Sequence, residues 1–131
     1  MNSILIVDDD SDARETVTKY LTKAGFVTRS APNGREALIA IATSVPDVII
    51  LDAMMPEMSG MEFLQIIRSY LRWSTVPVIL LTAYDKGPHI DRARDFGINC
   101  IFLKANYQFA NLLSCIHRLR SDPAADCSAA G

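Results

Sequence analysis

Four apolar runs of this sequence each end in a side chain suited to phosphoryl chemistry. The first run ends in the carboxylates of Asp8 and Asp9, and the second in that of Asp52. The third ends in the hydroxyl of Thr82 and the fourth in the ammonium of Lys104. Crowded carboxylates favour a hard divalent cation such as Mg²⁺, and a carboxylate is also a nucleophile toward phosphorus. An ammonium and a hydroxyl hold phosphoryl oxygens, so the set is suited to a metal ion and a phosphoryl group.

The four runs are short, continuous and rich in Ile, Leu and Val, which is typical of strands buried on both faces of a parallel sheet. They cover residues 4–7, 48–51, 78–81 and 100–103. In open α/β sheets, ligands bind outside the carboxyl ends of the strands. The polar residues that follow the runs are therefore expected at one edge of one sheet.

The segments between the runs carry helix signals and one further strand. The spacing Asp12-Ala13-Arg14-Glu15 predicts a capping box that opens a helix, and Gly25 is expected to stop it. Ser59-Gly60-Met61-Glu62 repeats the capping-box spacing. The apolar positions expected to be buried are Val17, Tyr20, Leu21 and Ala24; Ala37, Leu38, Ile41 and Ala42; Leu64, Ile67 and Leu71; Ile90 and Ala93; and Phe109, Leu112, Leu113, Ile116 and Leu119. Residues 26–31 predict a less apolar strand at the sheet edge.

Five strands alternating with five helices predict a doubly wound, flavodoxin-like α/β fold. Right-handed crossovers, with polar site residues after strands one and three, indicate the parallel order 2-1-3-4-5. We expect a single domain over residues 1–120. Residues 121–131, rich in Ala, Ser, Asp and Pro, are expected to be a disordered tail or the start of a linker.

The composition excludes several classes of protein. A length of 131 residues suits one domain, and a net charge of -2 without a basic run argues against direct nucleic-acid binding. No apolar run is long enough for membrane insertion, and no signal peptide is expected at the N-terminus. The cysteines, Cys100, Cys115 and Cys127, have no metal-ligand spacing. We expect them to be reduced thiols in a cytoplasmic protein.

Each candidate residue has a structural interpretation when it is taken alone. Asp8, Asp9 and Asp10 could form a solvated turn and helix cap, and Asp52 could cap a loop. Thr82 and Lys104 alone would more often be structural or solvent-facing. The coincidence of all these residues at the same end of four strands favours a functional site.

The chain resembles the receiver domain of two-component response regulators, the CheY-like family, over essentially residues 2–120. The resemblance rests on ILIVDDD at residues 4–10, DAMMPEMSG at 52–60, PVILLTA at 77–83 and Lys104. It implies a Mg²⁺-dependent transfer of a phosphoryl group to Asp52 from a phosphohistidine of a sensor histidine kinase or phosphotransfer protein. Such a domain catalyses its own phosphorylation and slow dephosphorylation, and is not a conventional turnover enzyme.

The resemblance also assigns roles to the remaining residues. It implies that Asp9 and Asp52 bind Mg²⁺ directly, with Mn²⁺ as an alternative ion. Asp8 would assist through water, and the backbone carbonyl of Met54 would complete the protein ligands. The phosphoryl-binding and switch positions would be Thr82, Ala83 and Lys104.

The sequence departs from the family pattern near Lys104. Ala105 stands where proline is usual, so we expect the following loop to be either strained or rebuilt. Ile101 occupies the position of the usual aromatic switch residue, and Phe102 should point to the opposite face of the strand. We expect the output to rely less on an aromatic flip than in the family at large.

Met54 and Tyr84, each two residues after a site residue, are expected to flank the phosphoryl group. The hypothesis is that their bulk hinders the attacking water and prolongs the phosphorylated state. Ordinary loop packing is the alternative.

Two other functions remain as alternatives. A pseudo-receiver would use the same fold as a phosphorylation-independent protein-interaction module, which Ala105 and Ile101 favour mildly. A haloacid-dehalogenase-type phosphatase would need a DxDx[TV] motif, and Asp8 to Asp12 lack its last residue. In the preferred interpretation, the effect passes to a downstream protein or a further output domain. By resemblance, the surface involved is that of the fourth helix, fifth strand and last helix.

Overall fold

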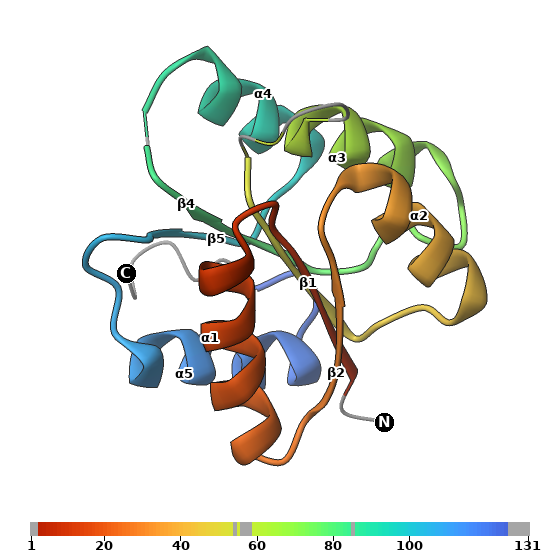
Figure 1. The fold of residues 1–131 in the computed structure, drawn as a ribbon. Coiled ribbons are helices and arrows are strands. Elements are labelled where there is room, and N and C mark those ends of the chain that lie inside the picture. The colour runs from red at the N-terminus through yellow and green to blue at the C-terminus, as the bar shows by residue number, and fades with distance from the viewer. Residues whose placement is uncertain (1–2, 54, 56–58, 85, 126–131) are drawn as a thin grey trace.

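The computed structural model describes residues 3–53, 55, 59–84 and 86–125, which form a five-stranded parallel sheet flanked by helices (Figure 1). The strands lie in the order β2-β1-β3-β4-β5, as predicted. They are β1 (Ser3–Val7), β2 (Val27–Ala31), β3 (Val48–Leu51), β4 (Val78–Thr82) and β5 (Cys100–Leu103). The helices are α1 (Ser11–Lys23), α2 (Gly34–Thr43), α3 (Gly60–Ser69), α4 (Pro88–Phe96) and α5 (Phe109–Ser121).

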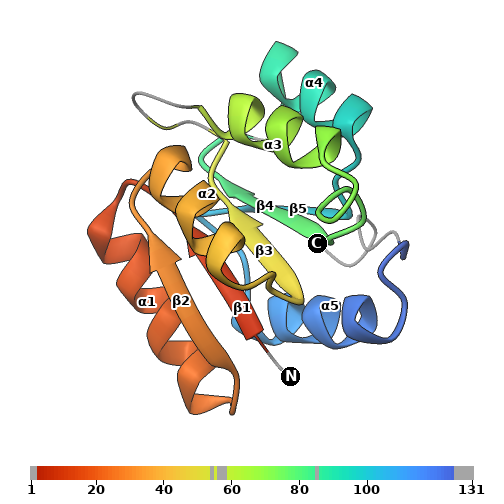
Figure 2. The ribbon, with the colours of Figure 1, turned by 90° about the vertical axis from the view of Figure 1, so that its right-hand side faces the viewer.

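The helices form two layers, one on each face of the sheet. Figure 2 shows α1 and α5 on one face and α2, α3 and α4 on the other. Each layer encloses its own apolar cluster, one that includes Phe63 and Ile67 of α3 and one that includes Leu21 of α1 and Leu112 of α5. The sheet therefore separates two cores, and side chains of adjacent strand residues enter different ones.

Burial on both faces explains why the strand sequences are continuously apolar. Every residue of β1, β3 and β4 is buried. The edge strand β2 is more exposed, with Val27 at 55% and only Ala31 of its residues buried. The prediction of a less apolar edge strand at residues 26–31 is thus confirmed.

The helix caps show which of the predicted helix starts are correct. Ser59 caps α3, since its side chain accepts a hydrogen bond from the Glu62 amide at 3.2 Å. The cap of α1 is Asp10, whose carboxylate accepts from the amides of Asp12 and Ala13. The prediction of a capping box starting at Asp12 is wrong, because Asp10 offers the same chemistry two residues earlier.

Some predicted core positions are also wrong. Leu71 is 92% exposed because α3 ends at Ser69, before that turn of the apolar pattern is complete. Tyr20 is 49% exposed, and Ala24 and Ala42 are exposed too, because they lie at the margin of the buried stripe. The periodic pattern gave the buried face of each helix but not its width.

The cysteine prediction fails for two of the three residues. Cys100 of β5 and Cys115 of α5 are joined by a disulfide in the core between the sheet and α5. Sequence spacing could not reveal this pair, because only the packing of α5 on β5 brings the sulfurs together. Cys127 lies outside the described residues.

The segment after α5 is hydrogen-bonded to Asn99, the residue that directly precedes β5. The side-chain amide of Asn99 donates to the carbonyls of Pro123 and Ala125, both at 2.9 Å. The Asn99 side-chain oxygen accepts from the amide of Val78 at 3.0 Å. The predicted boundary at residue 120 is therefore followed by a segment, 122–125, that is attached to the start of β5.

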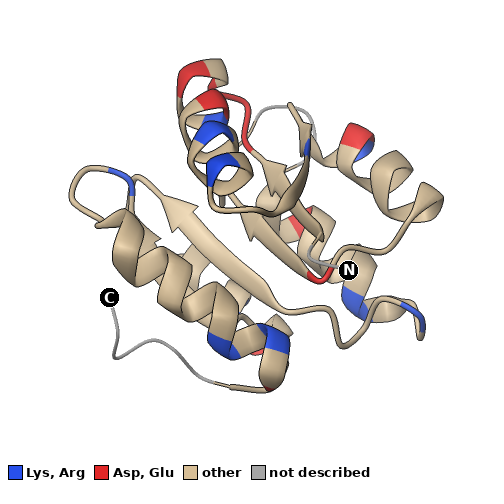
Figure 3. Cartoon of the chain, turned by 90° about the horizontal axis from the view of Figure 1, so that it is seen from below, with Lys and Arg blue, Asp and Glu red and all other residues tan. Residues whose placement is uncertain are grey.

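Charged residues lie mainly on helices and loops, and the strands are mostly uncharged (Figure 3). In this view Lys and Arg are spread over several elements rather than gathered on one helix. None of the helices in the described part of the chain has the length and apolar character that a membrane span requires.

Candidate functional site

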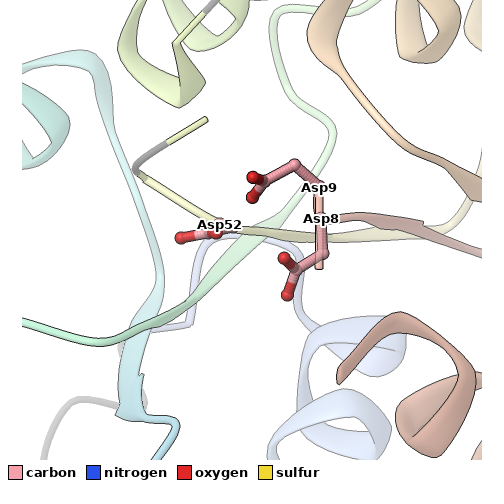
Figure 4. Close-up of side chains that lie close together, drawn as sticks. All are labelled: Asp8, Asp9 and Asp52. Carbon is pink, nitrogen blue, oxygen red and sulfur yellow. The ribbon is translucent and has the colours of Figure 1, made fainter. Parts of the chain in front are cut away.

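Three carboxylates meet at the carboxyl ends of β1 and β3 (Figure 4). One oxygen each of Asp8, Asp9 and Asp52 lies within 4.8 Å of the others. Asp8 and Asp52 are buried, at 3% and 5% exposure, whereas Asp9 is exposed. The cluster therefore has two oxygen ligands fixed in the protein and one facing solvent.

The sheet itself positions these residues. The amide of Asp8 donates to the carbonyl of Ala31, and the amide of Asp52 donates to that of Val7 at 2.9 Å. The amide of Lys104 donates in the same way to the carbonyl of Thr82 at 2.8 Å. Each site residue thus continues the hydrogen bonding of its strand by one residue, which fixes its backbone more firmly than a free loop would.

Lys104 bridges the two buried acids. Its Nζ lies 2.8 Å from one carboxylate oxygen of Asp8 and 3.2 Å from Oδ2 of Asp52. The Asp8 carboxylate also accepts from the amide of Asp10 at 3.0 Å. The side chains sent from β1, β3 and β5 to one edge of the sheet are therefore in direct contact.

The Lys104 ammonium is partly buried, with 22% of its side chain exposed. Burial lowers the pKa of Lys104, but the hydrogen bonds and charges of Asp8 and Asp52 together outweigh it. The net result is a pKa above the ordinary value. Lys104 is thus a permanent cation at neutral pH.

Thr82 ends β4 with its side chain fully buried. Among the described residues its Oγ1 has no hydrogen-bond partner. Leaving a buried hydroxyl unpaired costs about 1–3 kcal/mol, so such groups in native proteins usually serve a ligand or a water. The neighbouring Ala83 is exposed, so the site opens to solvent beside Thr82.

Gly60, the first residue of α3, packs against the backbone that carries Asp52. A Cβ at this position would overlap the carbonyl oxygen of Asp52 and lie 2.9 Å from the Cα of Ala53. The amide of Gly60 donates to the carbonyl of Ala53 at 3.2 Å. Only glycine allows α3 to start this close to the end of β3.

The family model of the response regulator receiver domain matches residues 4–117 of this chain. The matched region includes β1 from its second residue, the whole of the other four strands, the acid cluster and Lys104. The chain belongs to this family.

Similar proteins agree with this assignment. The probable transcriptional regulatory protein SilR of Salmonella typhimurium is 35% identical over 116 residues, which are 88% of this chain and 50% of SilR. The chemotaxis protein CheY4 of Vibrio cholerae has a similar structure, with a TM-score of 0.83 and 30% identity over 90% of this chain and 98% of CheY4. The signal receiver domain of a histidine kinase from Syntrophus aciditrophicus gives a TM-score of 0.82 and 32% identity, covering 92% and 91% of the two chains.

The receiver domain spans only half the length of SilR, whereas it matches almost all of CheY4. Receiver domains as a family interact with histidine kinases or phosphotransfer proteins, and with output domains. They also generally bind Mg²⁺, for which the acid cluster supplies oxygen ligands.

The loop after Lys104 is built without the usual proline. No cis peptide bond occurs among the described residues, and the chain turns because the amides of Asn106 and Tyr107 both donate to the carbonyl of Leu103. Of the two outcomes expected for Ala105, the loop is the rebuilt one. Ala105 itself is exposed.

Ile101, at the switch position, and its neighbour Phe102 face opposite sides of the sheet, as predicted. Ile101 is partly buried and packs against the core under α3 and α4. Phe102 is 3% exposed and belongs to the core under α1 and α5. In this receiver domain the only aromatic in β5 is therefore turned away from the α4 side.

The structure describes one of the two residues that are expected to flank the phosphoryl group. Tyr84 is 66% exposed at the start of the β4–α4 loop. Met54 lies outside the described residues, so its roles as a carbonyl ligand and a flanking side chain stay predictions.

Sequence reasoning missed one supporting residue. Arg14 of α1 donates from its guanidinium to the backbone carbonyl of Asp8 at 2.7 Å. This bond ties the first turn of α1 to the end of β1, where the acid cluster begins. A spacing of six residues carries no sequence signal, so only the packing of α1 shows this contact.

Proposed function

We propose that this receiver domain is a phosphoacceptor in a two-component or phosphorelay system, with Asp52 as the residue that is phosphorylated. The donor is a phosphohistidine of a sensor histidine kinase or a histidine phosphotransfer protein. The contact of Lys104 with both Asp8 and Asp52 is the observation that carries the proposal. It brings a carboxylate nucleophile and a fixed positive charge into one oxygen-rich site.

The transfer is a displacement at phosphorus. A carboxylate oxygen of Asp52 attacks, the bond from phosphorus to the donor imidazole nitrogen breaks, and that nitrogen keeps the electron pair and takes up a proton. Lys104 holds a phosphoryl oxygen by charge, and the hydroxyl of Thr82, which has no hydrogen-bond partner in the described part of the chain, donates to another. Ala83, exposed beside Thr82, leaves room for the group.

The residues present also fit a divalent cation. Asp9 and Asp52 would hold it directly and Asp8 through water, since the group of possible ligands found among the described residues consists of three carboxylates. Bound Mg²⁺, or Mn²⁺ in its place, would neutralise charge on the phosphoryl oxygens. Lys104 already holds Asp8 and Asp52 at the required edge of the sheet.

Dephosphorylation returns Asp52 to its free carboxylate. A water attacks phosphorus, the bond to the Asp52 oxygen breaks, and inorganic phosphate leaves. The receiver domain thus catalyses its own modification and slow recovery rather than turnover of a free substrate.

The decisive experiment is intact mass after incubation with acetyl phosphate and Mg²⁺. We expect the wild-type chain to gain one phosphoryl group and Asp52→Asn to gain none. Asp12→Asn, which removes an exposed carboxylate of α1 outside the cluster, is the matched control and should react like the wild type.

The same experiment separates the alternative. If the wild type gains no phosphoryl group and also fails to bind Mg²⁺, the pseudo-receiver interpretation replaces this one. If Mg²⁺ binds but no phosphoryl group is gained, the rebuilt loop at Ala105 becomes the first place to examine.

We propose further that Tyr84 prolongs the phosphorylated state by hindering water. Tyr84→Ala should shorten the phosphoryl half-life several-fold, measured by the decay of phosphorylated mass after removal of acetyl phosphate. Tyr70→Ala removes a ring of similar exposure far along the chain from the site, and should leave the half-life unchanged. An unchanged half-life in Tyr84→Ala would leave only a packing role for this residue.

Signal output is proposed to pass through the surface of α4, β5 and α5, to a downstream protein or an output domain. The domain itself is taken as residues 1–120, acting in the cytoplasm without direct contact to nucleic acid. Because Ile101 replaces the usual aromatic, we expect neither Ile101 nor Phe102 to change its burial on phosphorylation. A structure of the phosphorylated form would check this.

A further inference from the structure

Cys100 and Cys115 join the strand that leads to Lys104 with the helix that follows it. Cys100 is the first residue of β5, and Cys115 lies in the middle of α5. Both are 1% exposed and belong to the core between the sheet, α1 and α5. Their sulfurs are bonded to each other across a sequence separation of 15 residues.

The bond closes a covalent ring that contains Lys104. The ring runs from Cys100 through β5, the rebuilt turn and the first half of α5 to Cys115. The acid cluster on β1 and β3 lies outside it. A bond at this place therefore constrains the element that carries the ammonium and leaves the nucleophile Asp52 untouched.

We propose that Cys100 and Cys115 form a reversible redox modification site that fixes α5 to β5 in the oxidised state. The chemistry needs a two-electron oxidant such as a peroxide. One thiol is oxidised to a sulfenic acid while the peroxide is reduced to water, and the second thiol then attacks the sulfenic sulfur and releases a second water. A dithiol reverses the bond through a mixed disulfide.

The surroundings favour a bond that is specific and slow to exchange. Leu112, Ile116 and Phe102 belong to the same core as both sulfurs, which excludes external thiols while α5 is docked. The same burial places the two sulfurs next to each other rather than next to solvent. Oxidation thus yields the internal disulfide in preference to mixed products.

The test counts thiols in the whole chain. The protein is reduced with dithiothreitol, or treated with hydrogen peroxide, and then alkylated in guanidinium with N-ethylmaleimide and weighed. We expect three alkyl groups after reduction, and one after oxidation, on Cys127. Proteolysis of the oxidised form should give one linked pair of peptides, containing Cys100 and Cys115.

Matched variants separate the pair from the third cysteine. Cys127→Ala should give two alkyl groups when reduced and none when oxidised. Cys115→Ala should show no redox-dependent change in melting temperature, whereas oxidation of the wild type should raise it by roughly 10 °C, because the closed loop has 15 residues. Hydrogen exchange in α5 should slow on oxidation in the wild type alone.

Three alkyl groups after peroxide treatment, or a linked peptide that contains Cys127, would overturn the proposal. The thiol count does not depend on whether Asp52 is phosphorylated, so the redox site and the phosphoacceptor stand or fall separately.

Discussion

The ammonium of Lys104 lies between the two buried acids, and this contact sets the behaviour of the site before any phosphoryl group arrives. Without it, Asp8 and Asp52 would be two neighbouring carboxylates that are 3% and 5% exposed. Two like charges buried side by side repel each other, and this repulsion destabilises the folded state. Lys104 therefore has a structural role in the resting domain beside its expected role toward phosphate.

Lys104→Met should separate these roles. Without Mg²⁺ we expect the free energy of unfolding to fall by about 1–2 kcal/mol, less than for a fully buried pair because Lys104 is partly solvated. Millimolar Mg²⁺ should restore much of the loss, while labelling by acetyl phosphate should fall at least tenfold. Urea titrations and intact mass measure the two effects. Lys86→Met, at an exposed loop position, should change neither.

The phenol of Tyr107 makes the stability of the fold depend on pH in alkaline solution. Burial raises the pKa of its phenol, and the nearby Tyr20 adds to the shift. Since the folded state holds this proton more tightly than the unfolded chain, stability is full below pH 10 and declines as the pH rises above it. Tyr107→Phe should lessen that decline, seen in urea titrations at pH 8 and near pH 11. Tyr84→Phe is the exposed control, and an equal decline in all three proteins would contradict the assignment.

At the scale of elements, the close approach of α3 to the end of β3 holds the acceptor in place. Gly60→Ala would force the Asp52–Ala53 backbone away from α3. We expect a loss of about 1–3 kcal/mol in unfolding free energy, and a labelling rate by acetyl phosphate several-fold below the wild type. Gly25→Ala is the control, since Gly25 has a φ of +100° but no atoms near its added Cβ. It should lower stability by backbone strain alone and keep the labelling rate.

The elements also show what the sequence could and could not predict. Strand order and the edge position of Asp8, Asp52 and Lys104 were predictable, because apolar runs ending in polar residues define both the sheet and its functional end. The Lys104 bridge was not, since it joins residues 96 and 52 positions apart. The disulfide and the Arg14 contact span shorter separations, but no spacing rule marks either, and only the packing of α5 on β5 and of α1 on β1 brings the groups together. Helix ends were displaced where two acids in one turn, such as Asp10 and Asp12, could each serve as the cap.

At the scale of the whole molecule, Asn99 attaches the end of the described chain to the sheet at the start of β5. Its side chain makes three hydrogen bonds, with Val78, Pro123 and Ala125. Asn99→Ala should cost about 1–3 kcal/mol in unfolding free energy and increase hydrogen exchange in residues 122–125. Asn111→Ala, on the exposed side of α5, is the matched control. Ala125 also packs against the core under α1 and α5, and equal exchange in the two variants would show that this packing alone holds the segment.

The strand β5 has Asn99 at one end and Lys104 at the other. A strand is stiff along its axis, because its backbone is already nearly extended and can hardly lengthen. β5 therefore holds Lys104 and Asn99 at a nearly fixed separation. The short strand is thus a rigid spacer between the acid cluster, which Lys104 contacts, and the segment after α5, which Asn99 binds.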